Sequence, residues 1–295
     1  MTELPATEAL DPATVEIDRL DDVALARVLV EAHRGVVDAA LAASDAIARA
    51  TALVAEAIES GGRIVLVGAG TSGRLAVLDA SELPPTFGVD PALVEARIAG
   101  GDAALRRAVE GAEDDAAAGA RAVDDVGPGD VVIGISASGG APFVRAAVRT
   151  ARERGALTVG IVNAPDGALA RDADVGIVAA TGAEPIAGST RMRAGTAQKI
   201  VLNAISTGAM IRLGKTYGNR MVDLVATNAK LRARSERLVH DLAGTDADAR
   251  ALLDAAGGSV KIAVVMARRG VDRAEAERLL RNARGRLARV IDDPG

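Results

Sequence analysis

The chain has 295 residues, of which 49% are hydrophobic and only 1% aromatic, so any core must be built from aliphatic side chains. The formal net charge of −5 and the scarcity of aromatic stacking side chains argue against a nucleic-acid surface, and we expect no nucleic-acid partner. Cysteine is absent, which excludes disulfides and thiol catalysis. The two histidines, His33 and His240, are far apart in sequence, so we expect no metal site.

The N-terminal sequence M-T-E-L-P-A-T-E is acidic and lacks the apolar core of a signal peptide. No apolar run reaches the ~18–20 residues that a membrane-spanning helix needs. We therefore expect a cytoplasmic protein with no membrane partner. Residues 1–20 are predicted to be irregular, and apolar spacing predicts helices from residue 22 to residue 60, where Gly61 and Gly62 end the pattern.

Strands and helices alternate from residue 64 to residue 179. Apolar runs rich in Val and Ile predict five strands buried on both faces, at 64–67, 92–98, 131–136, 157–162 and 175–179. Helices are predicted in the gaps, at 73–80, 103–109, 113–123 and 142–154. This order predicts an α/β fold with a parallel sheet flanked by helices, in which ligands bind at the carboxyl ends of the strands.

The rest of the chain is predicted to be helical. One long helix is expected over 190–214 and another over 220–242, followed by three short helices in the tail. Capping patterns at Thr245 with Asp248, and at Asp272 with Glu275, mark two of their starts. We predict an N-terminal arm with helices (1–50), a sheet domain (51–243) and a small helical domain (244–295).

The first predicted strand runs into G-A-G-T-S-G at 68–73, which matches the pattern G-x-G-x-x-G. A glycine loop that opens a helix offers N–H groups and a positive dipole end to an anion, so Gly70, Thr71 and Ser72 are candidate ligands. Dinucleotide binding would need an acidic residue at the end of the next strand, and Glu95 falls inside that strand. A phosphate, a dinucleotide and an unliganded turn all remain open.

A second loop of the same kind follows the third predicted strand. It contains Ser136, Ser138 and Gly139, and a helix is predicted to begin at Pro142. Two such loops suit a compact phosphate better than an extended pyrophosphate, although the serines could be helix caps alone. A third polar cluster, 181–193, precedes the long helix and adds Ser189 and Thr190 as candidate ligands, with a helix N-cap beside a surface charge cluster as the equal alternative.

Two carboxylates stand out near these loops. Glu82 lies in D-A-S-E-L-P-P, where the helix of the first loop is predicted to stop at two prolines. Glu113 lies in V-E-G-A-E-D, at the start of a predicted helix. Each could be an ordinary solvated residue at a helix end. With no thiol and no histidine pair, however, carboxylates are the remaining candidates for general acid–base catalysis.

Taken together, these segments resemble a known family over nearly the whole chain. The chain resembles sugar isomerase (SIS) domains and, within them, the N-acetylmuramic acid 6-phosphate etherase family. The resemblance rests on a partial match at 11–20, G-A-G-T-S-G-R at 68–74, D-A-S-E-L-P-P-T-F-G at 79–88, I-A-G-G at 98–101, V-E-G-A-E-D at 109–114, G-S-T-R-M-R-A-G-T-A-Q-K at 188–199 and G-N-R-M-V-D-L-V-A-T-N-A-K-L at 218–231.

The resemblance implies an SIS-type three-layer fold, a small C-terminal three-helix (UBA-like) domain, a homodimer and no cofactor. It implies a lyase that splits the lactyl ether of N-acetylmuramate 6-phosphate into N-acetylglucosamine 6-phosphate and D-lactate, by elimination and then hydration, in cell-wall sugar recycling. Glu82 would be the acid and Glu113 the base. The alternatives within the fold are a non-catalytic phosphosugar sensor and a sugar-phosphate isomerase. One departure is the segment at 140–143, where the family commonly has a polar or basic residue followed by Thr-Pro-Tyr.

Overall fold

The computed structural model describes residues 6–224, 229–244 and 248–292. The chain forms two compact units, one of residues 1–80 with 92–206 and the other of residues 81–91 with 207–295. None of the described helices combines the length and the apolar character needed to cross a membrane. The three domain limits expected from the sequence remain a prediction.

The first unit is built on a five-stranded, fully parallel sheet, as predicted. Its strands are β1 (Ile64–Gly68), β2 (Val94–Ile98), β3 (Val131–Ile135), β4 (Leu157–Val162) and β5 (Val175–Val178). They lie in the order β2-β1-β3-β4-β5, so the strand order reverses between β1 and β3. The crevice at such a reversal is where open α/β sheets bind ligands.

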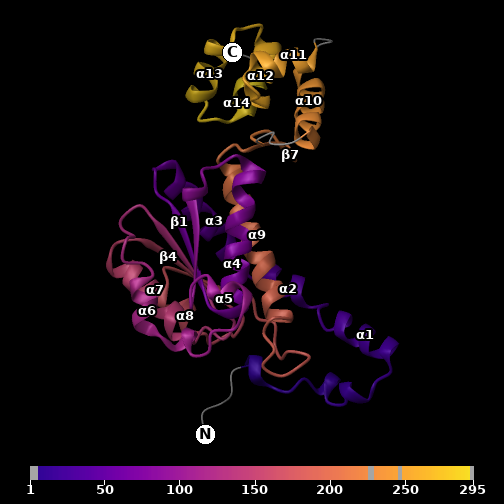
Figure 1. The fold of residues 1–295 in the computed structure, drawn as a ribbon, viewed down its shortest axis with the longest axis vertical. Coiled ribbons are helices and arrows are strands. Elements are labelled where there is room, and N and C mark those ends of the chain that lie inside the picture. Colours follow the sequence, from indigo (N-terminus) through magenta and orange to yellow (C-terminus); the bar gives the residue numbers. More distant parts are fainter. Residues whose placement is uncertain (1–5, 225–228, 245–247, 293–295) are drawn as a thin grey trace. The chain divides into compact units, whose positions relative to one another are not determined.

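Helices cover both faces of this sheet (Figure 1). On one face Val65, Val67 and Val132 pack into a core with helices α6 (Ala116–Arg121), α7 (Pro142–Glu153) and α8 (Ala168–Asp172). The other face is covered by α3 (Ser44–Glu59), which packs against β1, β3 and β5. Every residue of β1 and β3 is buried, because apolar runs of this kind face helices on both sides.

The N-terminal segment is helical from residue 22, as predicted, whereas the described part of residues 1–20, predicted to be irregular, includes short 3₁₀ turns. It contains the short 3₁₀ turns η1 (Ala6–Glu8), η2 (Pro12–Thr14) and η3 (Ile17–Arg19), followed by α1 (Asp22–Glu31) and α2 (Val36–Ala42). No residue of α1 is buried within the single chain.

Several predicted helix boundaries were wrong. Helix α4 spans Gly70–Phe87, so it begins three residues early and continues through Pro84 and Pro85 instead of stopping there. Each proline removes one hydrogen bond to the residue four positions earlier, and the buried side chains of Leu83 and Phe87 hold the last turns. Helix α5 ends early, at Ala103–Arg106, because Arg107 adopts an extended backbone. The helix predicted over 113–123 divides into η5 (Ala112–Asp114) and α6.

The long helix predicted over 190–214 is α9, Arg193–Arg212. The second unit then begins with a small antiparallel hairpin of β6 (Thr216–Tyr217) and β7 (Arg220–Met221), where a helix was expected from residue 220. Its core is formed by α10 (Ala229–Ala243), α11 (Ala249–Ala255), α12 (Val260–Arg269) and α13 (Arg273–Asn282), with a short α14 (Leu287–Ile291). Asp272 is the N-cap of α13 as predicted. Asp248, expected as the partner of a cap at Thr245, is itself the N-cap of α11, and Thr245 lies outside the described residues.

Candidate active site

A cavity of about 570 Å³ lies where β1 and β3 end, at the reversal of the strand order. Both glycine- and hydroxyl-rich loops line it, and so do a carboxylate-bearing turn, the N-terminal arm and the loop before α9. The lining residues are Thr7, Glu8, 69–72, 113–114, 135–138, 140–142, Gly188 and Thr190. None of these lining residues is basic. An anion bound here would therefore be held by N–H groups and hydroxyls.

The first loop packs tightly because of its glycines. Gly70 has a φ of +53°, a left-handed conformation that L side chains rarely adopt. A Cβ on Gly73 would stand 2.5 Å from the side chain of Ile98, so glycine at 73 lets α4 start directly against the sheet. The first N–H groups of α4 have no partner within the helix. These N–H groups, together with Thr71 and Ser72, form the part of the cavity wall where an anion would bind.

The second loop presents two hydroxyl groups that donate to no acceptor among the described residues. The Ser136 hydroxyl accepts a hydrogen bond from the N–H of Gly139 at 3.1 Å. The Ser138 hydroxyl accepts one from the N–H of Gly140, also at 3.1 Å. A serine that accepts through its lone pairs can still donate its own hydrogen to a ligand. Helix α7 begins at this wall without a side-chain cap, which leaves its first N–H groups open as well.

Ser72 is held from behind by a buried chain of side chains. Its hydroxyl donates to Gln198 Oε1 at 2.9 Å, and Gln198 Nε2 donates to Asn163 Oδ1 at 2.9 Å. Asn163 Nδ2 in turn donates to the backbone carbonyl of Ala179, at 2.9 Å. The amide side chains are almost completely buried, so these bonds satisfy groups that have no access to water. This series of hydrogen bonds connects the first loop to α9 and to the ends of β4 and β5.

The two predicted catalytic carboxylates differ in their position. Glu113 lies in η5, which packs against α7, and it lines the cavity together with Asp114. Glu82 lies on the last part of α4, which belongs to the second unit; it is exposed and is not among the residues that line the cavity. Glu113 therefore meets the two loops within one unit, whereas Glu82 does not.

The remaining predicted ligands also separate into two groups. Thr190 lines the cavity, whereas Ser189, its neighbour, does not. Gly139 is buried behind the second loop, where a Cβ would approach the Cα of Gly167 to 2.6 Å. Its positive φ of +70° shapes the turn that presents Ser136 and Ser138.

A buried carboxylate organises the loop that carries Thr190. Glu184 is completely buried, and its two carboxylate oxygens accept hydrogen bonds from the N–H groups of Arg193 and Ala194, at 2.8 and 2.9 Å. It therefore satisfies the first N–H groups of α9, where a negative charge is favourable. The polar cluster at 181–193 thus has a structural role as well as a place at the cavity.

The sequence-based prediction missed the contribution of the N-terminal arm. Thr7 and Glu8 line the cavity, and the Gly188 N–H donates to the carbonyl of Thr7 at 3.1 Å. Further along the arm, Arg193 Nη1 lies 3.5 Å from a carboxylate oxygen of Asp11. The pair Thr7–Glu8 stands in a stretch without periodicity, so no local pattern marked it.

Asp79, which precedes Glu82 by three residues on α4, was also missed. It is buried, and its Oδ1 accepts hydrogen bonds from Asn203 Nδ2 at 2.6 Å and from the Ser206 hydroxyl at 3.3 Å. Burial raises the pKa of the Asp79 carboxyl above its ordinary value, against the opposing effect of these hydrogen bonds. The contact fastens α4 to α9.

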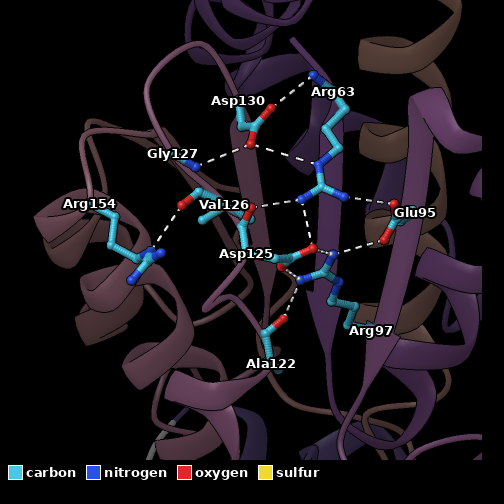
Figure 2. A network of polar contacts seen from close by, with 9 residues as sticks. All are labelled: Arg63, Glu95, Arg97, Ala122, Asp125, Val126, Gly127, Asp130 and Arg154. Atoms are coloured by element: carbon cyan, nitrogen blue, oxygen red, sulfur yellow. Dashed lines mark hydrogen bonds and ion pairs between the residues drawn. The ribbon is translucent and has the colours of Figure 1, made fainter.

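Glu95, the residue that a dinucleotide would require, has structural partners instead (Figure 2). It accepts hydrogen bonds from Arg63 at 2.9 Å and from Arg97 at 2.8 Å, and both arginines also bind Asp125. Asp130 completes this set, which we call the edge network: Arg63, Glu95, Arg97, Asp125 and Asp130. Because Glu95 is paired within this network along edge strand β2, the structure gives no support to ribose binding by this residue.

The fold and the cavity define an SIS-domain protein. Residues 46–152 match the family model "Glucokinase regulatory protein N-terminal SIS domain", and residues 107–207 match the model "SIS domain". A phosphoheptose isomerase from Francisella tularensis has a similar fold, with a TM-score of 0.51 and 20% sequence identity over 65% of this chain and 100% of that chain.

More similar relatives identify the family. The chain is 48% identical to the N-acetylmuramic acid 6-phosphate etherase of Deinococcus radiodurans, over 99% of this chain and 97% of the relative. It is 52% identical to the enzyme of the same name from Symbiobacterium thermophilum, over 90% and 89% of the two chains. The chain belongs to the N-acetylmuramic acid 6-phosphate etherase family.

Proposed function

We propose that this protein is a carbon–oxygen lyase that cleaves the D-lactyl ether of N-acetylmuramic acid 6-phosphate. The products are N-acetylglucosamine 6-phosphate and D-lactate, and the reaction serves the recycling of cell-wall amino sugars. The observation that carries the proposal is a single cavity that unites two anion-binding loops with the carboxylate of Glu113, in a chain about half identical to named etherases. These relatives favour an etherase over a phosphosugar sensor or an isomerase.

The phosphate is assigned to the two loops. Thr71, Ser136 and Ser138 supply hydroxyl groups, and α4 and α7 add N–H groups and the positive ends of their dipoles. Ser72, Gly70 and Thr190 complete this proposed set. The phosphate is remote from the reacting C2 and C3 atoms of the sugar, so its binding energy serves to position them.

The carboxylates are assigned to the proton transfers. Glu113 acts as the base that takes the C2 proton of the open-chain sugar, a proton made acidic by the neighbouring aldehyde. The C3–O bond then breaks, and Glu82 protonates the departing lactate oxygen. Water adds to the resulting double bond to give the product hydroxyl at C3. Glu82 is assigned from the family resemblance, and Glu113 also from its place in the cavity.

The proposal includes a cytoplasmic homodimer. Large apolar side chains are exposed along the N-terminal segment of the single chain, and a second copy would remove them from water. They are Leu10, Val15, Leu20, Val23, Val30, Val37 and Leu41. A phosphorylated sugar is too polar to cross a bilayer unaided, which supports a location where such sugars are made.

Incubation of the purified protein with N-acetylmuramate 6-phosphate tests the function directly. We expect D-lactate to be released in equal amount to N-acetylglucosamine 6-phosphate. A folded protein that binds the substrate but releases no lactate would contradict the etherase function and would favour a phosphosugar sensor. Aldose–ketose conversion without lactate would instead indicate an isomerase.

A further inference from the structure

The carboxylate of Glu8 has no role in the proposed reaction. Glu8 lines the cavity from the N-terminal arm, and its side chain has no hydrogen-bond or ion-pair partner among the described residues. A Cβ built on Gly188 would lie 2.8 Å from Glu8 Oε2, so the carboxylate rests directly against the backbone of the loop before α9. The positive φ of Gly188, +74°, also disfavours any other residue there.

The arm holds Glu8 in this place. Thr7 is only 1% exposed, and its carbonyl accepts the hydrogen bond from the Gly188 N–H. The hydroxyl of Thr7 is buried at the cavity without a partner among the described residues. The Asp11–Arg193 contact fastens the same arm a few residues later. A buried hydroxyl without a partner, as in Thr7, is unusual. The carboxylate of the next residue, Glu8, is exposed and lines the same cavity.

An ionised carboxylate can only accept hydrogen bonds, and it repels a phosphate. Glu8 is therefore suited to a part of the ligand that donates hydrogen bonds. The hydroxyl groups and the amide N–H of an amino sugar are such donors, and they are the part of the ligand that free phosphate lacks.

We propose that Glu8 is a specificity-determining residue that binds the sugar part of the ligand, by accepting a hydrogen bond from a hydroxyl or amide N–H group. The inference rests on the proposed function, since it takes an amino-sugar phosphate as the ligand. It makes the N-terminal arm part of the binding site. The site then selects a sugar phosphate over inorganic phosphate through Glu8, while the loops recognise the phosphate common to both.

The test compares two ligands, N-acetylglucosamine 6-phosphate and inorganic phosphate, by titration calorimetry. For Glu8→Ala we expect affinity for the sugar phosphate to fall about tenfold or more, because a hydrogen bond to a charged group is lost. Affinity for inorganic phosphate should stay the same or rise, because a repelling charge is removed. Glu8→Gln, whose amide oxygen still accepts, should recover part of the sugar affinity.

Glu16→Ala is the matched control, because Glu16 lies on the same arm, exposed and paired with Arg19, away from the cavity. It should bind both ligands as the unaltered protein does. Turnover gives a second readout: Glu8→Ala should raise KM for N-acetylmuramate 6-phosphate more than it lowers kcat. A thermal melt of each variant confirms that the fold is retained.

Two results would overturn the proposal. One is an unchanged sugar-phosphate affinity in a folded Glu8→Ala protein; the other is an equal loss for both ligands, which indicates that Glu8 only anchors the arm. Failure of the proposed function is seen separately. If the unaltered protein binds the sugar phosphate but releases no lactate, the etherase reaction is contradicted, while the contrast between the two ligands still decides the role of Glu8. If it binds both ligands equally well, the Glu8 proposal is overturned too.

Discussion

The edge network and the cavity use the same kinds of side chain in opposite ways. In the edge network each of the two arginines contacts at least two carboxylates, so every charge has a partner (Figure 2). In the cavity, Glu8 and Glu113 have no partner among the described residues, and no basic side chain lines the wall. The charged side chains of the edge network are therefore occupied by one another, whereas the cavity carboxylates are available to a ligand.

Pairing within the edge network also lowers the pKa values of its carboxyl groups. Hydrogen bonds from Arg97, and next from Arg63, hold the pKa of Asp125 far below its ordinary value. A hydrogen bond from Arg97 is also the main reason why the pKa of Glu95 is lowered. Such shifts couple the charge pairs to folding stability. We therefore expect changes in the cavity to alter turnover and binding, and changes in the edge network to alter stability alone.

The largest effect is expected from the proposed catalytic carboxylates. Glu113→Gln should lower kcat by about 100-fold or more, because a positioned base is removed, and should leave affinity for N-acetylglucosamine 6-phosphate nearly unchanged. Lactate release and calorimetry measure the two quantities. Glu82→Gln should behave in the same way, as expected for the acid.

Glu110→Gln is the control for Glu113, since Glu110 lies three residues earlier, is exposed and does not line the cavity. It should keep full turnover. A Glu113→Gln protein with normal kcat would reject Glu113 as the base, and a normal kcat in Glu82→Gln would reject Glu82 as the acid.

The next effect concerns the second loop, which is proposed to bind the phosphate. Ser138→Ala should weaken binding of inorganic phosphate and of the sugar phosphate by a similar factor, about tenfold, because a hydrogen bond to a charged group is lost. This pattern is the opposite of that expected for Glu8→Ala. Ser44→Ala serves as the control, because its hydroxyl donates to the Leu41 carbonyl. Unchanged phosphate affinity in Ser138→Ala would show that the phosphate does not bind at the second loop.

A smaller effect is expected in the edge network. Asp125→Ala leaves Arg63 and Arg97 with fewer partners and should lower the free energy of unfolding by about 1 kcal/mol, since the side chains are partly exposed. Urea unfolding measures the change, and kcat/KM of the folded variant should stay the same. Asp124→Ala, at an exposed neighbour without such contacts, should have no effect. A loss of activity in folded Asp125→Ala would break the separation between the two regions.

The smallest effect is a dependence of stability on pH. The pKa values of Asp125 and Glu95 are lowered on folding, so between their folded values and the unfolded values near ~4 the unfolded chain binds more protons. Their contribution is present above pH ~4 and is lost as the pH falls below it. Urea titrations at pH 5, 4 and 3 should show a smaller loss for Asp125→Ala than for the unaltered protein. An equal loss of stability in the two proteins would show that the edge network does not cause the dependence on pH.

The sequence by itself determined the layers of the first unit and the two hydroxyl-rich loops that line the cavity. Short apolar runs rich in Val and Ile, such as 131–135, are typical of strands buried on both faces, and a glycine loop between strand and helix has a local geometry. Glu113, Ser136 and Ser138 could be chosen because each lies next to such a landmark. The family, too, could be recognised from short segments spread along the chain.

Only the tertiary structure decided which distant residues join these landmarks. Glu8 and Thr190 reach one cavity across more than half of the chain, because the hydrogen bond from the Gly188 N–H to the Thr7 carbonyl holds the arm against the loop before α9. Glu95 matched a spacing rule but is paired with two arginines, which no local pattern reveals. Helix α4 continues through its prolines because Leu83 and Phe87 are buried. In each case a long-range contact outweighed the local signal.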